Sequence, residues 1–152
     1  MEQALKFLRS QKILVIASRD EREVLATNVY MASNEDGQIY FVSPEGAKHS
    51  TMMLKNPEVA FATAWFNEKD HTDRKGIQGS GRCEIVTDLK KITEGIMLLN
   101  ERFPDLKRSI TVQYILENIW KSRMWVIGPK SIKYWDDELY RDDQSREFTF
   151  SL

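Results

Sequence analysis

The sequence predicts a mainly β protein of the α+β type, built as an antiparallel barrel of six strands with a few peripheral helices. Three observations lead to this prediction. Short segments along the whole chain have the apolar or alternating pattern of strands. Most connections between them are as short as those of hairpins, which favours antiparallel pairing and closure into a barrel. Residues 88–103 instead repeat apolar side chains every three or four positions, so one long helix should close an end or a side of the barrel.

The first half of the chain is expected to contain two short helices and four strands. Residues 2–10 and residues 46–56 have the spacing and the boundaries of short helices. Asp36 and Gly37 favour a tight hairpin, because glycine readily adopts the positive φ that such turns require. Large side chains alternate with alanines in 58–66, so one face of this strand should be small, with something packed closely against it. The predicted strands are 13–18, 24–33, 38–43 and 58–66.

The second half is expected to begin with a charged loop at 67–76. A strand interrupted by glycines follows at 77–86, where the glycines indicate a bulge or a close approach by a ligand or another backbone. A linker and a short helix at 110–120 come after the long helix. The last predicted elements are a hairpin of 124–128 and 131–136, which turns at Gly128-Pro129-Lys130, and a loosely held polar tail at 137–152. No repeat or composition change divides the chain, so we expect a single domain over residues 1–152.

Composition excludes several classes of protein. Lysine and arginine number 22 against 23 acidic residues, so the net charge of −1 argues against general binding of nucleic acid. Cys83 is the sole cysteine, which excludes an intrachain disulfide and a cysteine-based zinc site. The apolar run near the start is too short to span a bilayer and lacks the order of a signal peptide, so we expect a cytoplasmic protein without a membrane partner.

The common catalytic and metal-binding patterns are missing from the sequence. His49 and His71 are far apart and have no neighbouring residues at metal-ligand spacing. No nucleophile motif surrounds a serine, and Cys83 lies within a predicted strand, where a buried, inert thiol is the better interpretation. We therefore assign no catalytic residue and no metal site.

The segment SPEGAKHSTMMLKNP places polar residues at the start of the second predicted helix. Free N–H groups at a helix start bind phosphate well when a lysine or hydroxyl reinforces them, and Lys48, Ser50 and Thr51 have the required chemistry. A simpler interpretation is that Ser43 caps the helix, Glu45 compensates its dipole and Lys48 is merely solvated. The sequence alone leaves both interpretations open.

Three segments in a fixed order resemble the pyridoxamine 5'-phosphate oxidase-like family of FMN-binding split barrels. They are LATNVYMASNEDGQIYFVS (25–43), AKHSTMMLKNPEVAFATAW (47–65) and IQGSGRCEIV (77–86). SIKYWDD also resembles the last strand of the family, so the resemblance covers residues 5–136. It implies a six-stranded split β-barrel that forms a homodimer, with flavin sites at the interface between the subunits.

The resemblance also implies a set of cofactor-binding residues. Lys48 would pair with the FMN phosphate, aided by Ser43 and by Ser50 or Thr51. The strand of residues 26–29 would lie beside the isoalloxazine ring, and hydrogen bonds at that ring edge tune the flavin potential. Trp65 would border the ring or belong to the core. The residues implied at the ring and the ribityl chain are Ala26, Thr27, Asn28, Val29, Phe41, Val42 and Gln78.

Two departures from the family pattern narrow the expected function. Gly46 and Ala47 stand where many members have serine and arginine, so the phosphate site lacks a hydroxyl and a cation. REFTFSL (146–152) lacks the tryptophan and histidine of the true oxidases, so we do not expect oxidation of pyridoxamine phosphate. The chain is more similar to the small members of the general-stress and nitroimidazole-resistance types.

The expected function is an FMN-dependent oxidoreductase that passes electrons from a reduced nicotinamide to a small acceptor. One alternative is a flavin-binding sensor or carrier without turnover. Others are a barrel that uses FAD, the deazaflavin F420 or haem, in which haem ligation would rest on His49 or His71. The last is a structural barrel dimer that binds no flavin.

Overall fold

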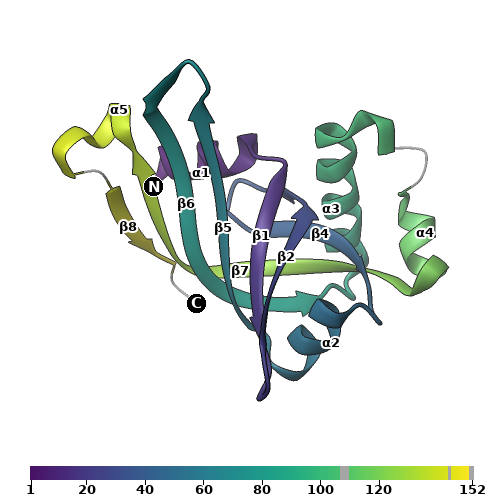
Figure 1. Ribbon diagram of the computed structural model, residues 1–152. Helices are drawn as coiled ribbons and strands as arrows, with labels where there is room; N and C mark the ends of the chain where they lie inside the picture. Colours follow the sequence, from purple (N-terminus) through teal and green to yellow (C-terminus); the bar gives the residue numbers. More distant parts are fainter. Residues whose placement is uncertain (107–109, 144, 151–152) are drawn as a thin grey trace.

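The computed structural model describes residues 1–106, 110–143 and 145–150, which form one strongly curved antiparallel sheet with helices around it (Figure 1). The strands pair in the order β2-β1-β5-β6-β7-β4-β3, and β8 adds to β7. This confirms the predicted class, a mainly β split barrel, although the sheet has eight strands and six were predicted. The strands are β1 (Ile13–Arg19), β2 (Val24–Tyr30), β3 (Ala32–Ser33), β4 (Ile39–Pro44), β5 (Glu58–Asn67), β6 (Asp70–Ile85), β7 (Ser122–Asp136) and β8 (Ser145–Thr149).

The helices lie at the ends and on one side of the sheet. The long helix begins after Asp88, whose side chain accepts a hydrogen bond from the Lys91 N–H and so caps it. The predicted helix at 110–120 is shorter than expected, because Asn118 adopts a left-handed φ of 55° and ends it. The helices are α1 (Glu2–Ser10), α2 (Lys48–Lys55), α3 (Leu89–Arg102), α4 (Val112–Leu116) and α5 (Asp137–Tyr140), with 3₁₀ turns at Pro104–Leu106, Ile119–Lys121 and Arg141–Asp143.

Two hydrophobic cores lie on opposite faces of strands β4 and β7. Phe41 and Trp125 face the barrel interior, where they stack with ring centroids 6.2 Å apart and pack with side chains of α1. Tyr40 and Met124 point to the other face and are covered by α3. The period-two alternation of these strands therefore serves two cores. The outer face of β1, β2 and β5 lies outside both cores, whereas α2 contributes Met53 to the barrel core.

Strand β5 has the two faces that its sequence predicts. Val59, Phe61 and Thr63 are buried in the barrel, whereas Ala60 and Ala64 are exposed on the outside. The small face is thus on the outer surface of the sheet, and nothing in the described part of the chain packs against it.

The glycines of β6 confirm the predicted close approach and bulge, with the protein's own atoms as the neighbours. A Cβ on Gly79 would collide with the ring of Phe61, and one on Gly81 would lie 2.6 Å from the carbonyl oxygen of Gly128. The register of β6 and β7 shifts between Ser80 and Gly81, which marks the bulge.

The predicted loop at 67–76 was wrong. Strand β5 runs to Asn67 and β6 begins at Asp70, so the segment forms most of a two-stranded ribbon with a tight turn. The Asn67 side chain accepts a hydrogen bond from the Lys69 N–H across this turn. Arg74 pairs with Asp137 at 2.8 Å, and this contact from the far end of the chain holds the charged ribbon in place.

The predicted final hairpin and polar tail were also wrong. Strand β7 continues through Gly128 and Pro129 as a single strand, because the bulge opposite them accommodates a residue that has no N–H to donate. The tail folds back as α5 and β8, and β8 pairs with β7 over residues 131–135. No helix within the described ranges is long and apolar enough to cross a membrane.

Candidate cofactor-binding site

The start of helix α2 lies at the edge of the barrel and is not capped. Ala47 occupies the N-cap position, and no side chain accepts a hydrogen bond there. Within the described ranges, no acceptor is found for the backbone N–H groups of Lys48, His49 and Ser50. Free N–H groups at the positive end of the helix dipole attract an anion. The structure therefore retains the feature on which the predicted phosphate site depends.

The simpler interpretation of this segment is not supported. Ser43 lies in β4, well before the helix, and its hydroxyl contacts the ring of His49 instead of a helix N–H. Glu45 pairs with Arg123, with 3.0 Å between its Oε2 and the arginine Nε. Neither residue therefore compensates the start of α2.

Lys48 is the first residue of the helix, and its side chain is 59% exposed. Its Nζ lies 2.7 Å from Oε2 of Glu23, in the turn that joins β1 and β2. Thr51 is exposed, but its hydroxyl donates to the carbonyl oxygen of Lys48. An incoming anion would thus compete with Glu23 for the lysine ammonium.

A short chain of polar groups lies under the helix start. The Ser43 Oγ is 2.6 Å from the His49 Nε2 and 3.4 Å from the Oγ of Ser50. Ser43 and Ser50 are buried, and burial lowers the pKa of His49, which favours its neutral form. The two hydroxyl groups therefore contact His49 and each other beneath the helix start, and they are not exposed to a ligand at its surface.

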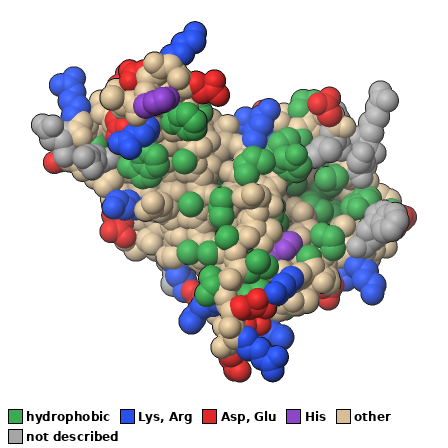
Figure 2. Space-filling view, in the orientation of Figure 1, with side chains coloured by type: hydrophobic (Ala, Val, Ile, Leu, Met, Phe, Trp, Pro, Cys, Tyr) green, Lys and Arg blue, Asp and Glu red, His purple; other side chains and the backbone are tan. Residues whose placement is uncertain are grey.

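Three of the residues predicted at the ring lie together on the outer face of the sheet. Pairing places Asn28 beside Val15, Val15 beside Ala62, and Ala62 beside Gln78, so these side chains form one row across four strands. Ala26 lies one row away on the same face. Hydrophobic side chains are spread over this face, and charged ones gather toward its edges (Figure 2).

The other predicted residues do not join this row. Thr27 and Val29 point to the opposite face of β2, and Val29 is buried in the barrel core. Phe41 is fully buried, so the predicted contact with the ribityl chain would have to be made by its backbone. Val42 packs against the core under α3. Trp65 is 43% exposed but lies near the far end of β5, away from α2.

Sequence reasoning missed two charged residues near the helix start, Glu23 and Arg123. Glu23 and Lys48 are separated by 25 positions, and Arg123 comes beside Ser43 only through the pairing of β4 with β7. No local pattern connects these residues, so the sequence carries no signal for them.

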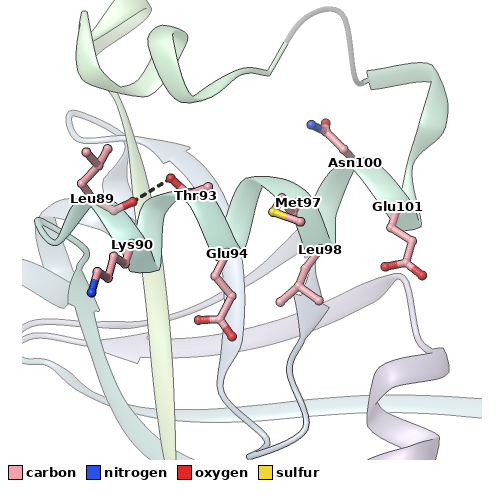
Figure 3. Close-up of a pocket in the computed structure, with 8 residues that line it drawn as sticks. All are labelled: Leu89, Lys90, Thr93, Glu94, Met97, Leu98, Asn100 and Glu101. Atoms are coloured by element: carbon pink, nitrogen blue, oxygen red, sulfur yellow. Dashed lines mark hydrogen bonds between the residues drawn. The ribbon is translucent and has the colours of Figure 1, made fainter.

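Two other features of the structure do not form functional sites. A hollow of about 850 Å³ lies along the outer side of α3 (Figure 3). Its side chains are spread along the helix, and Glu94 is engaged by the Tyr40 hydroxyl at 2.9 Å. Cys83 is buried, as predicted, and this burial raises the pKa of its thiol to about 12. The described residues contain no group of side chains that could hold a metal ion.

The residues present fit an anionic group at the start of α2. The helix start is uncapped, and its exposed Lys48 ammonium is shared with Glu23. The outer face of the sheet has a central row of uncharged side chains, namely Asn28, Val15, Ala62 and Gln78. This arrangement can hold a planar molecule that carries a phosphate or carboxylate at one end. A curved antiparallel sheet with such a site at its edge defines a protein of the split-barrel class.

Comparison with known proteins agrees with this class at the level of the fold. No family model matches the chain, and neither does any curated protein. A heme binding protein from Mycobacterium smegmatis superposes with a TM-score of 0.76 at 14% identity, over 97% of this chain and 57% of that one. A NimC/NimA family protein from Clostridium acetobutylicum superposes with a TM-score of 0.66 at 18% identity, over 99% of this chain and 92% of that one. HutZ, the heme storage protein of Vibrio cholerae, superposes with a TM-score of 0.64 at 19% identity, over 84% of this chain and 89% of that one.

Proposed function

We propose that the protein binds FMN and acts as an FMN-dependent oxidoreductase. The observation that carries this proposal is the uncapped start of α2, where three free N–H groups lie beside the exposed ammonium of Lys48. Phosphate suits such a site, because the helix dipole, the N–H groups and the lysine all favour a compact anion. The resemblance of the sequence to FMN-binding split barrels supports the same cofactor.

The chain's own residues would bind and orient the cofactor. Lys48 and the helix N–H groups would hold the phosphate after the lysine leaves Glu23. Asn28 and Gln78 present amide groups on the outer face, where they are accessible to the edge of a ring. Bound FMN supplies hydride and electron transfer between a reduced nicotinamide and a small acceptor. Glu23 and His49 lie at the start of α2 and not in the row of Asn28 and Gln78 where a ring would lie, so a flavin carrier without turnover is the nearest alternative.

We also propose that two copies of the chain associate through the outer face of β1, β2 and β5. Val15, Val24 and Tyr30 are exposed there, and alanines between them make the surface shallow. An exposed apolar surface of this kind is typical of an interface. We expect a dimer by sedimentation equilibrium at micromolar concentration, and a monomer would contradict a site shared by two subunits.

The proposed function is tested by titrating FMN with flavin-free protein while following flavin fluorescence. We expect saturable quenching, and we expect Lys48→Ala to weaken binding about tenfold or more. A charge-assisted contact to phosphate contributes ~1.5–3 kcal/mol, which corresponds to that loss. Riboflavin, which lacks the phosphate, should bind the two proteins equally.

Binding and catalysis are separated in a second step. Loaded protein is mixed with NADH or NADPH and a quinone, a nitro compound or a ferric chelate. Faster oxidation of the nicotinamide supports the oxidoreductase. Tight binding without turnover would support the flavin carrier and exclude the oxidoreductase. No quenching of flavin fluorescence in the first step would overturn the flavin proposal.

Haem is a second candidate, and two observations favour it. Two of the similar structures are named as heme binding or heme storage proteins. His49 is half-buried and held neutral, which is the form that ligates iron. Added haem should then give a Soret band that is lost in His49→Ala, or in His71→Ala if the exposed histidine is the ligand.

A further inference from the structure

A cleft opens where strands β1 and β5 separate. They pair only over Val15–Ala17 and Ala60–Ala62, and beyond Ala62 strand β5 continues with β6 as its pairing partner. The hydroxyl of Thr63 donates to the carbonyl oxygen of Ile13 at 2.9 Å, which makes the last link between the two strands. Between the ribbon and the corner of α1 and β1 lies a cleft of about 610 Å³. This volume is within the range of small-molecule sites.

An exposed indole forms one wall of the cleft. Trp65 follows the buried Thr63 on the inner face of β5, yet 43% of its surface is exposed. Phe7, Ile13 and Ala64 provide apolar surface beside it. A large aromatic side chain next to an apolar floor offers a face on which a flat ring can stack.

The charges around the cleft select an anion. Lys12 and Lys75 line it, and no carboxylate does. Lys75 is already engaged, with its Nζ 3.0 Å from Glu138 and 3.6 Å from Asp136. Lys12 has no carboxylate within ion-pair distance in the described part of the chain. Its Nζ lies over the ring of Phe103, 6.0 Å from the centroid, and a ligand anion would draw the ammonium from this weak cation–π contact into the cleft.

The negative end of helix α1 does not cancel this preference. Its last turn faces the cleft through Ser10 and Gln11. The Ser10 hydroxyl donates to the Phe7 carbonyl oxygen at 2.7 Å, and the Gln11 N–H donates to that of Leu8. Two of the helix-end carbonyl groups are thus occupied, and within the described ranges Lys12 is the lysine of the cleft that no carboxylate engages.

We propose that this cleft binds a flat aromatic molecule that carries an anionic group. The ring stacks on the indole of Trp65, and the anionic group pairs with Lys12. The site is separate from the start of α2, because Lys12 precedes β1 whereas Glu23, the partner of Lys48, follows it. A strand of seven residues puts about 20 Å between these ends. The inference therefore does not depend on the proposed flavin site.

Naphthalene-2-sulfonate, a flat aromatic anion, is a suitable probe. It is titrated into ¹⁵N-labelled, flavin-free protein at constant ionic strength, and the indole N–H resonance of Trp65, identified from a Trp65→Phe variant, is followed. We expect a saturable shift. Trp65→Leu should weaken binding about tenfold, and Lys12→Gln about fivefold, as loss of a stacking platform and of one ion pair predict.

Three controls make the result decisive. Lys6→Gln makes the same change of charge on the exposed side of α1 and should leave binding unchanged. Lys48→Ala should also leave it unchanged. The neutral analogue 2-naphthalenemethanol should bind several-fold more weakly than the sulfonate.

Other outcomes would overturn the proposal. A Trp65 resonance that does not shift would exclude the site. Equal losses in Lys6→Gln and Lys12→Gln would show diffuse attraction by the surface, and equal binding of the neutral analogue would exclude anion selection. FMN is also a flat aromatic anion and could enter the cleft itself, so its displacement of the probe is compared in wild type and Lys48→Ala. Displacement that Lys48→Ala weakens would show that the cleft is part of the flavin site and not a separate one.

Discussion

Asp136→Ala should lower the free energy of unfolding by about 3 kcal/mol, because it removes a buried carboxylate that several groups share. The carboxylate of Asp136 accepts hydrogen bonds from the Tyr134 hydroxyl at 2.6 Å and from the N–H groups of Glu138 and Leu139. The Lys75 ammonium lies 3.6 Å away. Loss of the carboxylate leaves the buried Tyr134 hydroxyl without its acceptor and the start of α5 without its cap. The C-terminal segment that holds the β5–β6 ribbon should loosen with it.

The same group makes stability depend on pH in a predictable direction. Burial alone would raise the pKa of Asp136, but the hydrogen bonds from Tyr134 and Leu139 and the charge of Lys75 outweigh it and lower that pKa. A carboxyl group whose pKa is lower in the folded state stabilises the fold above its ordinary pKa of 3.8, and this contribution is lost as the pH falls further. The difference in unfolding free energy between wild type and Asp136→Ala should therefore become smaller below that pH.

Urea unfolding of both proteins at neutral pH and in acid measures this effect. Asp137→Ala is the matched control, because Asp137 makes an ion pair with the exposed Arg74 and should contribute only about 0.5 kcal/mol. Asp136→Asn keeps an acceptor for the α5 N–H groups, so its loss of unfolding free energy should lie between those of Asp136→Ala and Asp137→Ala. If Asp136→Ala and Asp137→Ala destabilise equally, the buried network does not have the role described here.

Local patterns were sufficient for most of the strands and for helices α1, α2 and α3. The Asp36-Gly37 turn formed as predicted, with Gly37 at a φ of 82°. The failures share a physical cause, which is that contacts between distant segments decided the outcome. Arg74 and Lys75 lie in a strand because their backbone pairs with β5 and, at Lys75, with β7. Asp137 and Glu138 add exposed ion pairs from 63 positions away.

Pro129 illustrates the same limit. Gly-Pro-Lys is a good turn in isolation, so the sequence favoured a hairpin there. The structure instead places Pro129 opposite Gly81 at a bulge, where a missing N–H is tolerated. Whether a proline ends or merely interrupts a strand depends on its partner strand, and the partner cannot be inferred from the three residues.

The candidate site was predictable only in part. The free helix start and Lys48 follow from a short segment of sequence. The exposure of Trp65 and the burial of Phe41 do not, because both are aromatic residues on strands and differ only in what covers them. The competing Glu23 was not predictable either, since it reaches Lys48 from another turn of the fold.

Lys48→Glu should weaken FMN binding about a hundredfold or more. It removes an attractive charge from the phosphate and places a like charge beside it, and such contacts cost several kcal/mol. Glu23→Gln should act in the opposite direction, strengthening binding about threefold, because it frees the Lys48 ammonium from a surface pair that contributes at most about 1 kcal/mol. Opposite effects from the two members of one ion pair are the signature of an anion that competes with Glu23.

Lys55→Glu provides the matched control for this prediction. Lys55 lies in the last turn of the same helix, seven residues or about 10 Å from Lys48, where salt screens most of its charge. The double variant Glu23→Lys, Lys48→Glu returns an ammonium to within a few ångströms of the helix start. It should therefore bind FMN about tenfold more tightly than Lys48→Glu alone. Equal losses in Lys48→Glu and Lys55→Glu would mean that net charge, and not the helix start, controls binding. No recovery in the double variant would mean that the geometry of Lys48 itself is required, in which case the phosphate is held by a directed contact to that one side chain.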